Sequence, residues 1–270
     1  MPEGEPSEPN SVEAVIHYVD PSGPIGGIDD VERERSTFRL VPHVMPIRDA
    51  RPLRERLALE TNGFVWLRHP TSVADFTDER AVEQVYLPEA AAIVRRLMQA
   101  DHVLVFGHVR RDGSLNTSPH RPVFNAHIDY DEPTVRAIAR RLLGAEEYER
   151  RASQRIVLSN VWRPLAPVER NPLALCDASS VRREDLVFGP IVGKSASGLS
   201  NASGWNLAYS PRHRWHYLSR MQPDEVLVFK LCDTDEERVQ WTAHTSFEDP
   251  ASAAEAPQRR SIEVRTLAFI

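Results

Sequence analysis

The second half of the chain consists of short apolar runs, rich in β-branched and aromatic residues, that are separated by turn residues. Runs of this length and spacing are typical of the strands of a sandwich or barrel, and not of alternating strand–helix units. A mainly β structure is therefore predicted for this half. Its predicted strands span residues 156–161, 206–209, 215–218, 225–229, 239–242 and 261–269.

The first half mixes predicted strands with helices. Apolar residues recur at helical spacing between Thr77 and Ala100, where Pro88 is expected to kink or restart the helix. A second helix is indicated by Asp131 as its N-cap with a proline close behind, and it should end at Gly144. Further strands are predicted over residues 14–19, 63–67 and 102–106. Together these patterns predict an α+β chain with a mainly β core.

The N-terminal segment differs from the rest of the chain. Residues 1–12 are acidic and rich in proline, which predicts a disordered tail. They carry neither the basic nor the apolar region of a signal peptide. Residues 13–270 are expected to form a single domain, because a hydrophobic content of 41% supplies ample apolar material for one core.

The charge balance and the cysteines narrow the functional class. A net charge of −6 argues against nucleic acid or an anionic membrane surface as the main partner, since both reward clustered positive charge. No stretch of the sequence approaches the roughly 18 apolar residues that a membrane helix needs. The two cysteines, Cys176 and Cys232, form no CxxC pair and are expected to be reduced and packed in or near a core. A cytoplasmic location follows from these features.

A candidate metal site begins at the segment Asn-Ala-His-Ile-Asp that ends at Asp129. Residues at i and i+2 of an extended segment project to the same side, so His127 and Asp129 can bind one metal ion. His244 is the candidate for a third ligand. Two histidines and one carboxylate form the facial triad of non-haem Fe(II) oxygenases, which leaves positions open for a co-substrate and O₂. The alternative interpretation is a turn histidine that happens to lie beside an aspartate.

A co-substrate carboxylate also needs a binding group. Arg259 and Ser261 follow His244 in the last predicted strand, and period-2 alternation puts them on one face together with Glu263 and Arg265. The planar guanidinium of arginine binds a carboxylate through two parallel hydrogen bonds. Arg259 with Ser261 is the preferred pair, and Arg265 is the rival unless Glu263 neutralises it. The alternative is an edge strand whose charges prevent aggregation.

With these residues in view, the sequence resembles the AsaB-like hydroxylase/desaturase family, which includes the CmcJ protein of cephamycin biosynthesis. The resemblance extends from about Phe64 to Phe269, and its elements are specific through their joint order. They are residues 64–76, 127–130, 160–164, 172–177, 214–217, 224–230, 243–250 and 259–265. One departure from the family pattern is His216, which stands where an aromatic residue is common.

The resemblance implies a double-stranded β-helix (jelly-roll or cupin-like) core with flanking helices. It also implies Fe(II), 2-oxoglutarate as co-substrate and O₂, with the metal positions of the family on His127, Asp129 and His244. The implied reaction is the oxidation of an unactivated C–H bond of a small molecule in secondary metabolism. Hydroxylation, desaturation and oxidative cyclisation are all open.

Residues for the substrate are less well defined. Asn160 and Arg163 lie at the end of a predicted strand and can contact the substrate, but Arg163 is equally well explained as a buried partner of Asp177. Tyr209 is a candidate for the pocket wall or for the core. His120 precedes the metal motif closely enough to reach the rim of the pocket.

Two competing functions remain at this stage. One is a non-catalytic, cupin-like scaffold that assists a partner enzyme, and the other is a zinc hydrolase built on the same triad, although no general base is evident beside the metal. A homodimer or a complex with a partner enzyme is compatible with the sequence.

Overall fold

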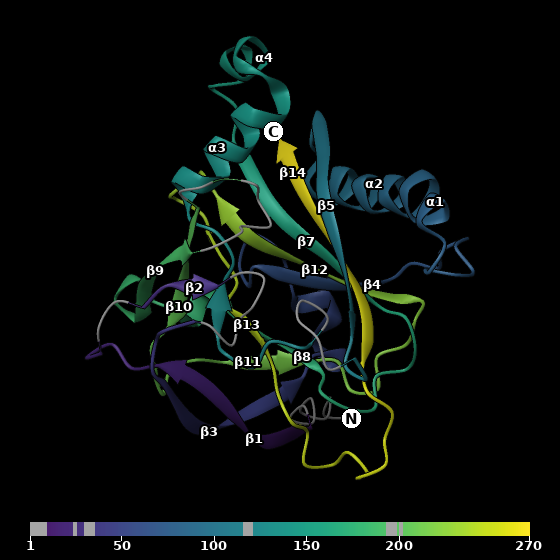
Figure 1. Ribbon diagram of the computed structural model, residues 1–270, viewed down its shortest axis with the longest axis vertical. Coiled ribbons are helices and arrows are strands. Elements are labelled where there is room, and N and C mark those ends of the chain that lie inside the picture. Colours follow the sequence, from purple (N-terminus) through teal and green to yellow (C-terminus); the bar gives the residue numbers. More distant parts are fainter. Residues whose placement is uncertain (1–9, 24–25, 30–35, 116–120, 193–198, 200–201) are drawn as a thin grey trace, which may run out of the picture.

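A computed structural model of the protein describes residues 10–23, 26–29, 36–115, 121–192, 199 and 202–270. Within these residues the strands form two sheets that face each other (Figure 1). The larger sheet contains, in spatial order, β1 (Ser11–Val19), β3 (Leu40–Asp49), β11 (Trp215–Tyr217), β8 (Leu173–Cys176), β13 (His244–Ser246), β6 (His127–Ile128), β10 (Ser203–Leu207), β9 (Leu186–Val192) and β2 (Ile28–Asp29). The smaller contains β4 (Phe64–Arg68), β12 (Glu225–Asp233), β7 (Ile156–Pro164), β14 (Arg260–Phe269) and β5 (His102–Asp112).

The larger sheet curls until it nearly closes on itself. Isolated bridges join His17 to Asn125 and Val19 to Ala208, so that β1 at one end lies beside β6 and β10. The smaller sheet covers the other face of β8, β13 and β6. This arrangement is a jelly roll with flanking helices, as predicted.

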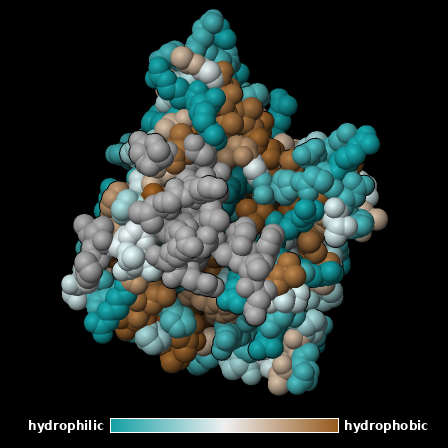
Figure 2. Space-filling view, viewed as in Figure 1, coloured by the Kyte–Doolittle hydropathy of each residue, from teal (hydrophilic) through white to brown (hydrophobic). Residues whose placement is uncertain are grey.

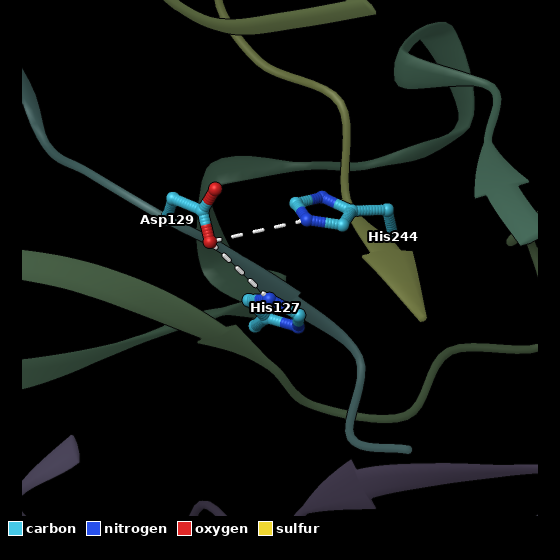
Figure 3. Close-up of side chains that lie close together, drawn as sticks. All are labelled: His127, Asp129 and His244. Carbon is cyan, nitrogen blue, oxygen red and sulfur yellow. Dashed lines mark ion pairs between the residues drawn. The ribbon is translucent and has the colours of Figure 1, made fainter. Parts of the chain in front are cut away.

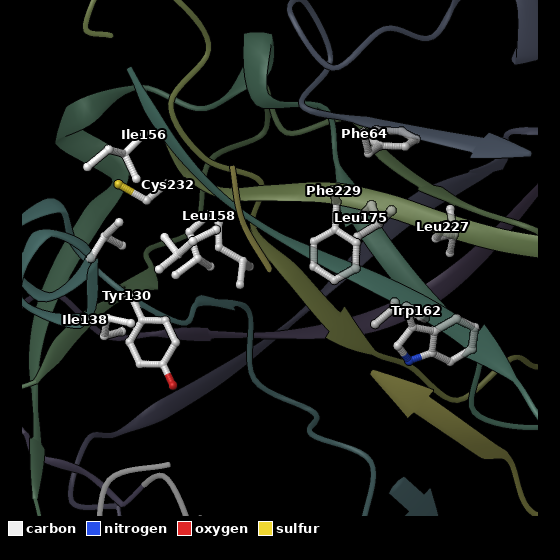
Figure 4. Close-up of a cluster of buried hydrophobic side chains, with 14 of the residues drawn as sticks. Phe64, Tyr130, Ile138, Ile156, Leu158, Trp162, Leu175, Leu227, Phe229 and Cys232 are labelled. Carbon is white, nitrogen blue, oxygen red and sulfur yellow. The ribbon is translucent and has the colours of Figure 1, made fainter. Parts of the chain in front are cut away.

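Three clusters of buried side chains fill the fold. The first lies between the two sheets and includes Trp162, Leu175 and Phe229 (Figure 4). The second lies between the smaller sheet and α2, where Val161 and Val264 pack. The third fills the curl of the larger sheet. Successive residues of one strand therefore serve different clusters, as the alternation of a strand requires.

Helices flank this core at its periphery (Figure 1). The predicted helix over residues 77–100 is divided into α1 (Glu79–Ala81), a π-helical turn (Val82–Tyr86) and α2 (Leu87–Met98). Pro88 lacks an N–H group to donate to the preceding turn, and that turn is widened. The second predicted helix is α3 (Glu132–Leu143), and α4 (Ala145–Arg150), which was not predicted, follows it. Short 3₁₀ helices span Arg51–Arg56, Ala178–Ser180 and Arg183–Asp185.

The cap of α3 follows the sequence signal. The side chain of Asp131 accepts a hydrogen bond from the N–H of Thr134 at 3.1 Å, which satisfies one of the N-terminal N–H groups of the helix. Gly144 ends the helix with a φ of 77°, a conformation that L side chains rarely adopt.

Three strand predictions need correction. Strand β1 begins at Ser11, inside the predicted tail, and residues 1–9 lie outside the described residues. The strand predicted over residues 206–209 spans Ser203–Leu207. Residues 239–242 form no strand, and the Val239 carbonyl, which a strand would pair with a neighbouring strand, accepts a hydrogen bond from the Lys230 ammonium instead. The Thr242 hydroxyl donates to the carbonyl of Gly63. The strand starts later, at His244.

Part of the surface of the larger sheet is hydrophobic. Figure 2 shows hydrophobic residues gathered over β1 and β3, where Val15 and Val44 are directly opposed and exposed by 40% and 64%. No helix of the described residues has the length and apolar character that crossing a membrane requires.

A buried charge cluster should make the stability of the fold depend on pH in the acidic range. The Lys230 ammonium, fully buried, donates to Glu60 and Asp233 at 3.0 and 2.7 Å. Burial alone would raise the pKa of Glu60, but hydrogen bonds from Lys230 and Arg155 lower it from 4.5 to about 2. A carboxyl group whose pKa is lower in the folded state than in the unfolded state stabilises the fold at pH values above the unfolded-state pKa. This stabilisation is lost as the pH falls from 4.5 towards 2. The free energy of unfolding, measured with urea across this pH range, should decrease in the wild type and decrease less in Glu60→Gln. Equal pH slopes would contradict this assignment.

Candidate metal centre and co-substrate cavity

The three predicted metal ligands meet at one point between the sheets (Figure 3). His127 on β6 and His244 on β13 are direct cross-strand partners, and Asp129 follows on the same segment as His127. One ligand atom from each residue lies within 4.8 Å of the others. The Nε2 atoms of His127 and His244 are 3.3 and 3.9 Å from the Asp129 Oδ1 atom. The strand pairing therefore brings together ligands that are far apart in the sequence.

Main-chain carbonyls fix the orientation of both imidazoles. The Nδ1 atom of His127 lies 2.8 Å from the carbonyl oxygen of Asn125, and that of His244 lies 3.3 Å from the carbonyl oxygen of Thr242. Because a carbonyl only accepts, each Nδ1 carries the proton and donates. Each Nε2 is then the atom that would give its lone pair to a metal ion shared with Asp129.

The electrostatics of Asp129 favour the ionised form. Burial alone would raise the pKa of Asp129, but the hydrogen bond from His127 and the charges of His244 and Arg265 hold it well below its usual range. All three ligand side chains are buried. With a metal ion bound, an ionised carboxylate and two neutral imidazoles on one face would form the donor set of a non-haem Fe(II) site. The residues present therefore fit Fe(II).

A cavity adjoins the metal position and contains Arg259. The side chains and backbone that line it belong to Arg111, Val123, His127, Trp162, Leu173, His244, Thr245, Ser246, Arg259 and Glu263. The Arg259 guanidinium donates to the carbonyl of Asn171 at 2.7 Å and to the Ser246 hydroxyl at 2.9 Å. It lies over the ring of Trp162, 5.3 Å from the ring centroid. Arg259 is thus held in the same cavity as both histidines.

Several buried polar atoms in this region have no hydrogen-bond partner. Two of them are the donors Nε of Arg259 and Oγ of Ser261, and both residues are at most 3% exposed. Buried donors are rarely left unsatisfied in proteins, and such atoms indicate a place where a ligand binds. A guanidinium N–H and a hydroxyl are both suited to a carboxylate. The pair therefore fits the distal carboxylate of a 2-oxo acid.

Known proteins match this chain over most of its length. The oxidoreductase/YMDC permease-like domain matches residues 16–269. The Fe(II)/2-oxoglutarate-dependent dioxygenase nvfI of Aspergillus novofumigatus is 32% identical, over 87% of this chain and 86% of the relative. The hydroxylase/desaturase asaB of Aspergillus flavus is 31% identical, over 71% of this chain and 90% of the relative. A solved structure of a variant of the iron and alpha-ketoglutarate-dependent endoperoxidase NvfI, 28% identical, superposes with a TM-score of 0.87 over 96% of this chain and 97% of that chain.

The chain belongs to this family of Fe(II)- and 2-oxoglutarate-dependent dioxygenases. The predicted resemblance to the hydroxylases and desaturases of the asaB type is confirmed, and so is the jelly-roll fold. The cofactor set of the family is Fe(II), 2-oxoglutarate and O₂, and the His-Asp-His site fits it.

The rival arginine of the dioxygenase is engaged elsewhere. The Arg265 guanidinium lies 3.4 Å from a carboxylate oxygen of Glu263 and over the ring of Tyr130. Strand β14 lies between β7 and β5, so the alternative of a charged edge strand is wrong. Glu263 therefore compensates part of the charge of Arg265, and the choice of Arg259 as the anchor of the co-substrate stays a prediction.

Asn160 lies beside the metal centre. It is fully buried on β7, and its Nδ2 atom is 3.5 Å from the Oδ2 atom of Asp129. Its Oδ1 atom has no hydrogen-bond partner. Asn160 therefore both contacts a metal ligand and presents an acceptor to a further molecule. Its assignment to the substrate stays a prediction.

Arg163 does not face the cavity of the dioxygenase. It projects from the opposite face of β7 and donates to the hydroxyl of Tyr86 at 3.1 Å and to the carbonyls of His69 and Pro223. The predicted substrate role does not fit this position, because the sheet separates Arg163 from the metal centre. The alternative partner was also wrong: Asp177 pairs with Arg214 at 3.1 Å.

The two remaining candidates for the substrate site are Tyr209 and His120. Tyr209 is 41% exposed and stacks on His43 with ring centroids 3.7 Å apart, and it is absent from the lining of the metal cavity. Its prediction as a pocket residue is therefore corrected. His120 lies outside the described residues. Arg111, which no sequence motif singled out, also lines the metal cavity.

Replacing Arg163 with leucine should destabilise the dioxygenase without weakening the binding of 2-oxoglutarate. The change leaves one hydroxyl and two carbonyls without their donor, at about 1–3 kcal/mol for each. At about 2–4 °C per kcal/mol for a chain of this size, the thermal midpoint should fall by about 10 °C or more. Differential scanning calorimetry and a 2-oxoglutarate titration measure the two effects. Loss of substrate conversion at an unchanged midpoint would return Arg163 to the substrate site.

Proposed function

We propose that this dioxygenase binds Fe(II) through His127, Asp129 and His244 and holds the distal carboxylate of 2-oxoglutarate on Arg259 and Ser261. It then oxidises an unactivated C–H bond of a small molecule. The observation that carries the proposal is the position of Arg259, because its unsatisfied Nε belongs to a residue of the cavity that both histidines line. Ser261, two residues further along the chain, has an unsatisfied Oγ as well.

The residues of the chain have distinct tasks in this reaction. When bound, iron and 2-oxoglutarate supply the activation of O₂ that the cleavage of a C–H bond requires. The imidazoles are aimed by main-chain carbonyls, and Arg259 is aimed by Ser246 and Asn171. Trp162 forms an apolar wall beside Arg259, which keeps water from the charged contact. Fixed ligands and an enclosed cavity position the co-substrate before the reaction.

The substrate is inferred to be a small metabolite. The relatives are a hydroxylase/desaturase and an endoperoxidase by name, so closely related chains reach different outcomes. In this chain Asn160 lies beside the metal ligand Asp129, and we propose that it contacts the substrate. The outcome depends on which C–H bond the cavity holds closest to the metal. A cytoplasmic setting fits the two buried free cysteines.

Succinate release is the test of the function. Purified protein with added Fe(II), O₂ and 2-oxoglutarate should release succinate, and release should stop on chelation of the metal. A non-catalytic scaffold or a zinc hydrolase would release none. Consumption of 2-oxoglutarate that depends on iron, faster with a cognate metabolite than without, is the result we expect.

A further inference from the structure

A second cavity, of about 450 Å³, shares no lining residue with the cavity of the metal centre. Arginines from three separate segments line it: Arg48 on β3, Arg56 at the end of the first 3₁₀ helix, and Arg214 immediately before β11. Its volume lies within the range of cavities that bind small molecules. The chain therefore has a basic cavity that the proposed oxidation does not use.

The strand register places this cavity relative to the metal centre. His216 of β11 and Arg48 of β3 lie two and three strands away from His244 of β13, in one row of paired residues. Neighbouring strands are about 4.8 Å apart, so Arg48 lies about 14 Å from the metal ligand. The residue of the row between the two histidines is Leu175, which is buried in the core between the sheets. A molecule in the second cavity is thus separated from the metal by packed side chains.

The charges of this cavity are unbalanced. Arg48 and Arg56 are exposed, and neither forms a hydrogen bond or an ion pair with a residue that the structure describes. Arg214 differs, because its Nη2 atom donates to Asp177 at 3.1 Å and to Ser179 at 2.7 Å. Asp177 is the one carboxylate among the described lining residues. Three guanidiniums and one carboxylate leave a net charge of +2, which attracts an anion.

His216, which departs from the family pattern, is a buried polar residue of the same cavity. Its Nδ1 atom lies 3.2 Å from the carbonyl oxygen of Arg214 and carries the proton, whereas its Nε2 atom has no partner among the described residues. Burial is the main cause that lowers the pKa of His216, and the nearby charges of Arg48 and Arg214 contribute. A bound anion would favour the protonated imidazole, which donates from Nε2 as well.

We propose that this cavity binds the phosphate group of a small phosphorylated metabolite. A guanidinium binds phosphate oxygens through parallel hydrogen bonds, and three guanidiniums from separate segments suit a group with three terminal oxygens. A phosphate monoester carries a charge of about −1.5 to −2 at pH 7, which matches the charge of the cavity. Leu53 and Leu57 also line the cavity and offer apolar contacts to the rest of the molecule. The site is independent of the proposed oxidation.

Titration calorimetry with phenyl phosphate and with inorganic phosphate tests the site. The iron-loaded protein, freed of unbound iron and kept anaerobic, is titrated as wild type, Arg48→Gln, Arg56→Gln and the matched control Arg54→Gln. Arg54 lies on the same 3₁₀ helix as Arg56 but outside the cavity, so its replacement changes the net charge equally.

We expect the wild type to bind both ligands at millimolar concentrations or below, and phenyl phosphate more tightly. Arg48→Gln and Arg56→Gln should each weaken the binding of phenyl phosphate by about 5- to 20-fold, because each removes a charged hydrogen bond at an exposed position. Arg54→Gln should stay within about twofold of the wild type.

Four results would overturn the proposal. They are a wild type without saturable binding of either ligand, equal losses in all three variants, equal affinity of the wild type for the two ligands, and a loss of phenyl phosphate binding in Arg259→Gln. The last result would place the ligand in the cavity of the metal centre. Thermal midpoints establish that the variants are folded, and if Arg48→Gln or Arg56→Gln does not fold, the other variant decides. Succinate release, which tests the proposed oxidation, is measured separately.

Discussion

Replacing His244 with alanine is expected to abolish Fe(II) binding and turnover. The variant keeps only His127 and Asp129, and a site with two protein ligands loses the facial geometry that holds the metal. Loss of a hydrogen-bond partner of a metal ligand already costs about 10- to 100-fold in affinity or activity. Removal of a ligand should therefore cost more than about 100-fold. Iron content after anaerobic reconstitution and succinate release measure the two effects.

His216 offers a matched control for this substitution. It is buried to a similar extent as His244, at 5% against 4% exposure, and its Nδ1 atom likewise lies near a main-chain carbonyl, that of Arg214 at 3.2 Å. It is not part of the metal centre. His216→Ala should lose stability and keep its iron. Full activity of His244→Ala at stoichiometric iron would show that the ligand assignment is wrong.

The second large effect is expected for Arg259→Gln, in the affinity for 2-oxoglutarate. Its guanidinium is held by Ser246 and Asn171 and has an unsatisfied Nε in a dry site. Removing a charge-assisted contact there should cost roughly 2–4 kcal/mol, about 30- to 1,000-fold in affinity. The matched control is Arg265→Gln, whose charge Glu263 compensates. Anaerobic titration of 2-oxoglutarate into both variants measures the difference.

The same titration decides whether Arg259 or Arg265 anchors 2-oxoglutarate. If only Arg265→Gln weakens the binding of 2-oxoglutarate, Arg265 is the anchor and Arg259 is a structural arginine that connects Asn171 with Ser246. If both weaken it equally, the two charges act through the field of the cavity, and neither makes the direct contact proposed for Arg259.

The metal ligands were predictable because their information is local. The i, i+2 spacing of His127 and Asp129 sets both side chains on one side of an extended segment whatever surrounds them. His244 was a candidate from residue type alone, because the strand predicted beside it over residues 239–242 does not form and the observed strand begins at His244 itself. The same local alternation correctly grouped Ser261 with Arg265 on one face of β14.

The failure at Arg163 has a signal that was available. Asn160 and Trp162 share one face of β7, so their neighbour Arg163 must project to the other face. The sequence places it there by parity alone, and only its partners required the fold. Arg111 is different. Its parity says nothing about the cavity until the register between β5 and β14 is known, and register between distant strands is set by tertiary packing.

The isolated run over residues 239–242 shows a second limit. Its residues have the composition of a strand, but the hydroxyl of Thr242 and the ammonium of Lys230 bind backbone carbonyls in this region. The Thr242 contact reaches Gly63, far away in the sequence, whereas the Lys230 contact is more local. Tertiary contacts of this kind override local preference.

The cross-strand pairing of His127 and His244 determines how metal loading and folding are linked. Both side chains are set by the β6–β13 ladder and by main-chain carbonyls, contacts that a divalent ion does not provide. In zinc fingers, by contrast, the ligands are ordered only as the ion binds. A chelator should therefore leave the circular dichroism of this protein unchanged. Added iron should raise the melting temperature only by mass action, with a gain of about 2.7 kcal/mol at a free concentration of about 100 times the dissociation constant.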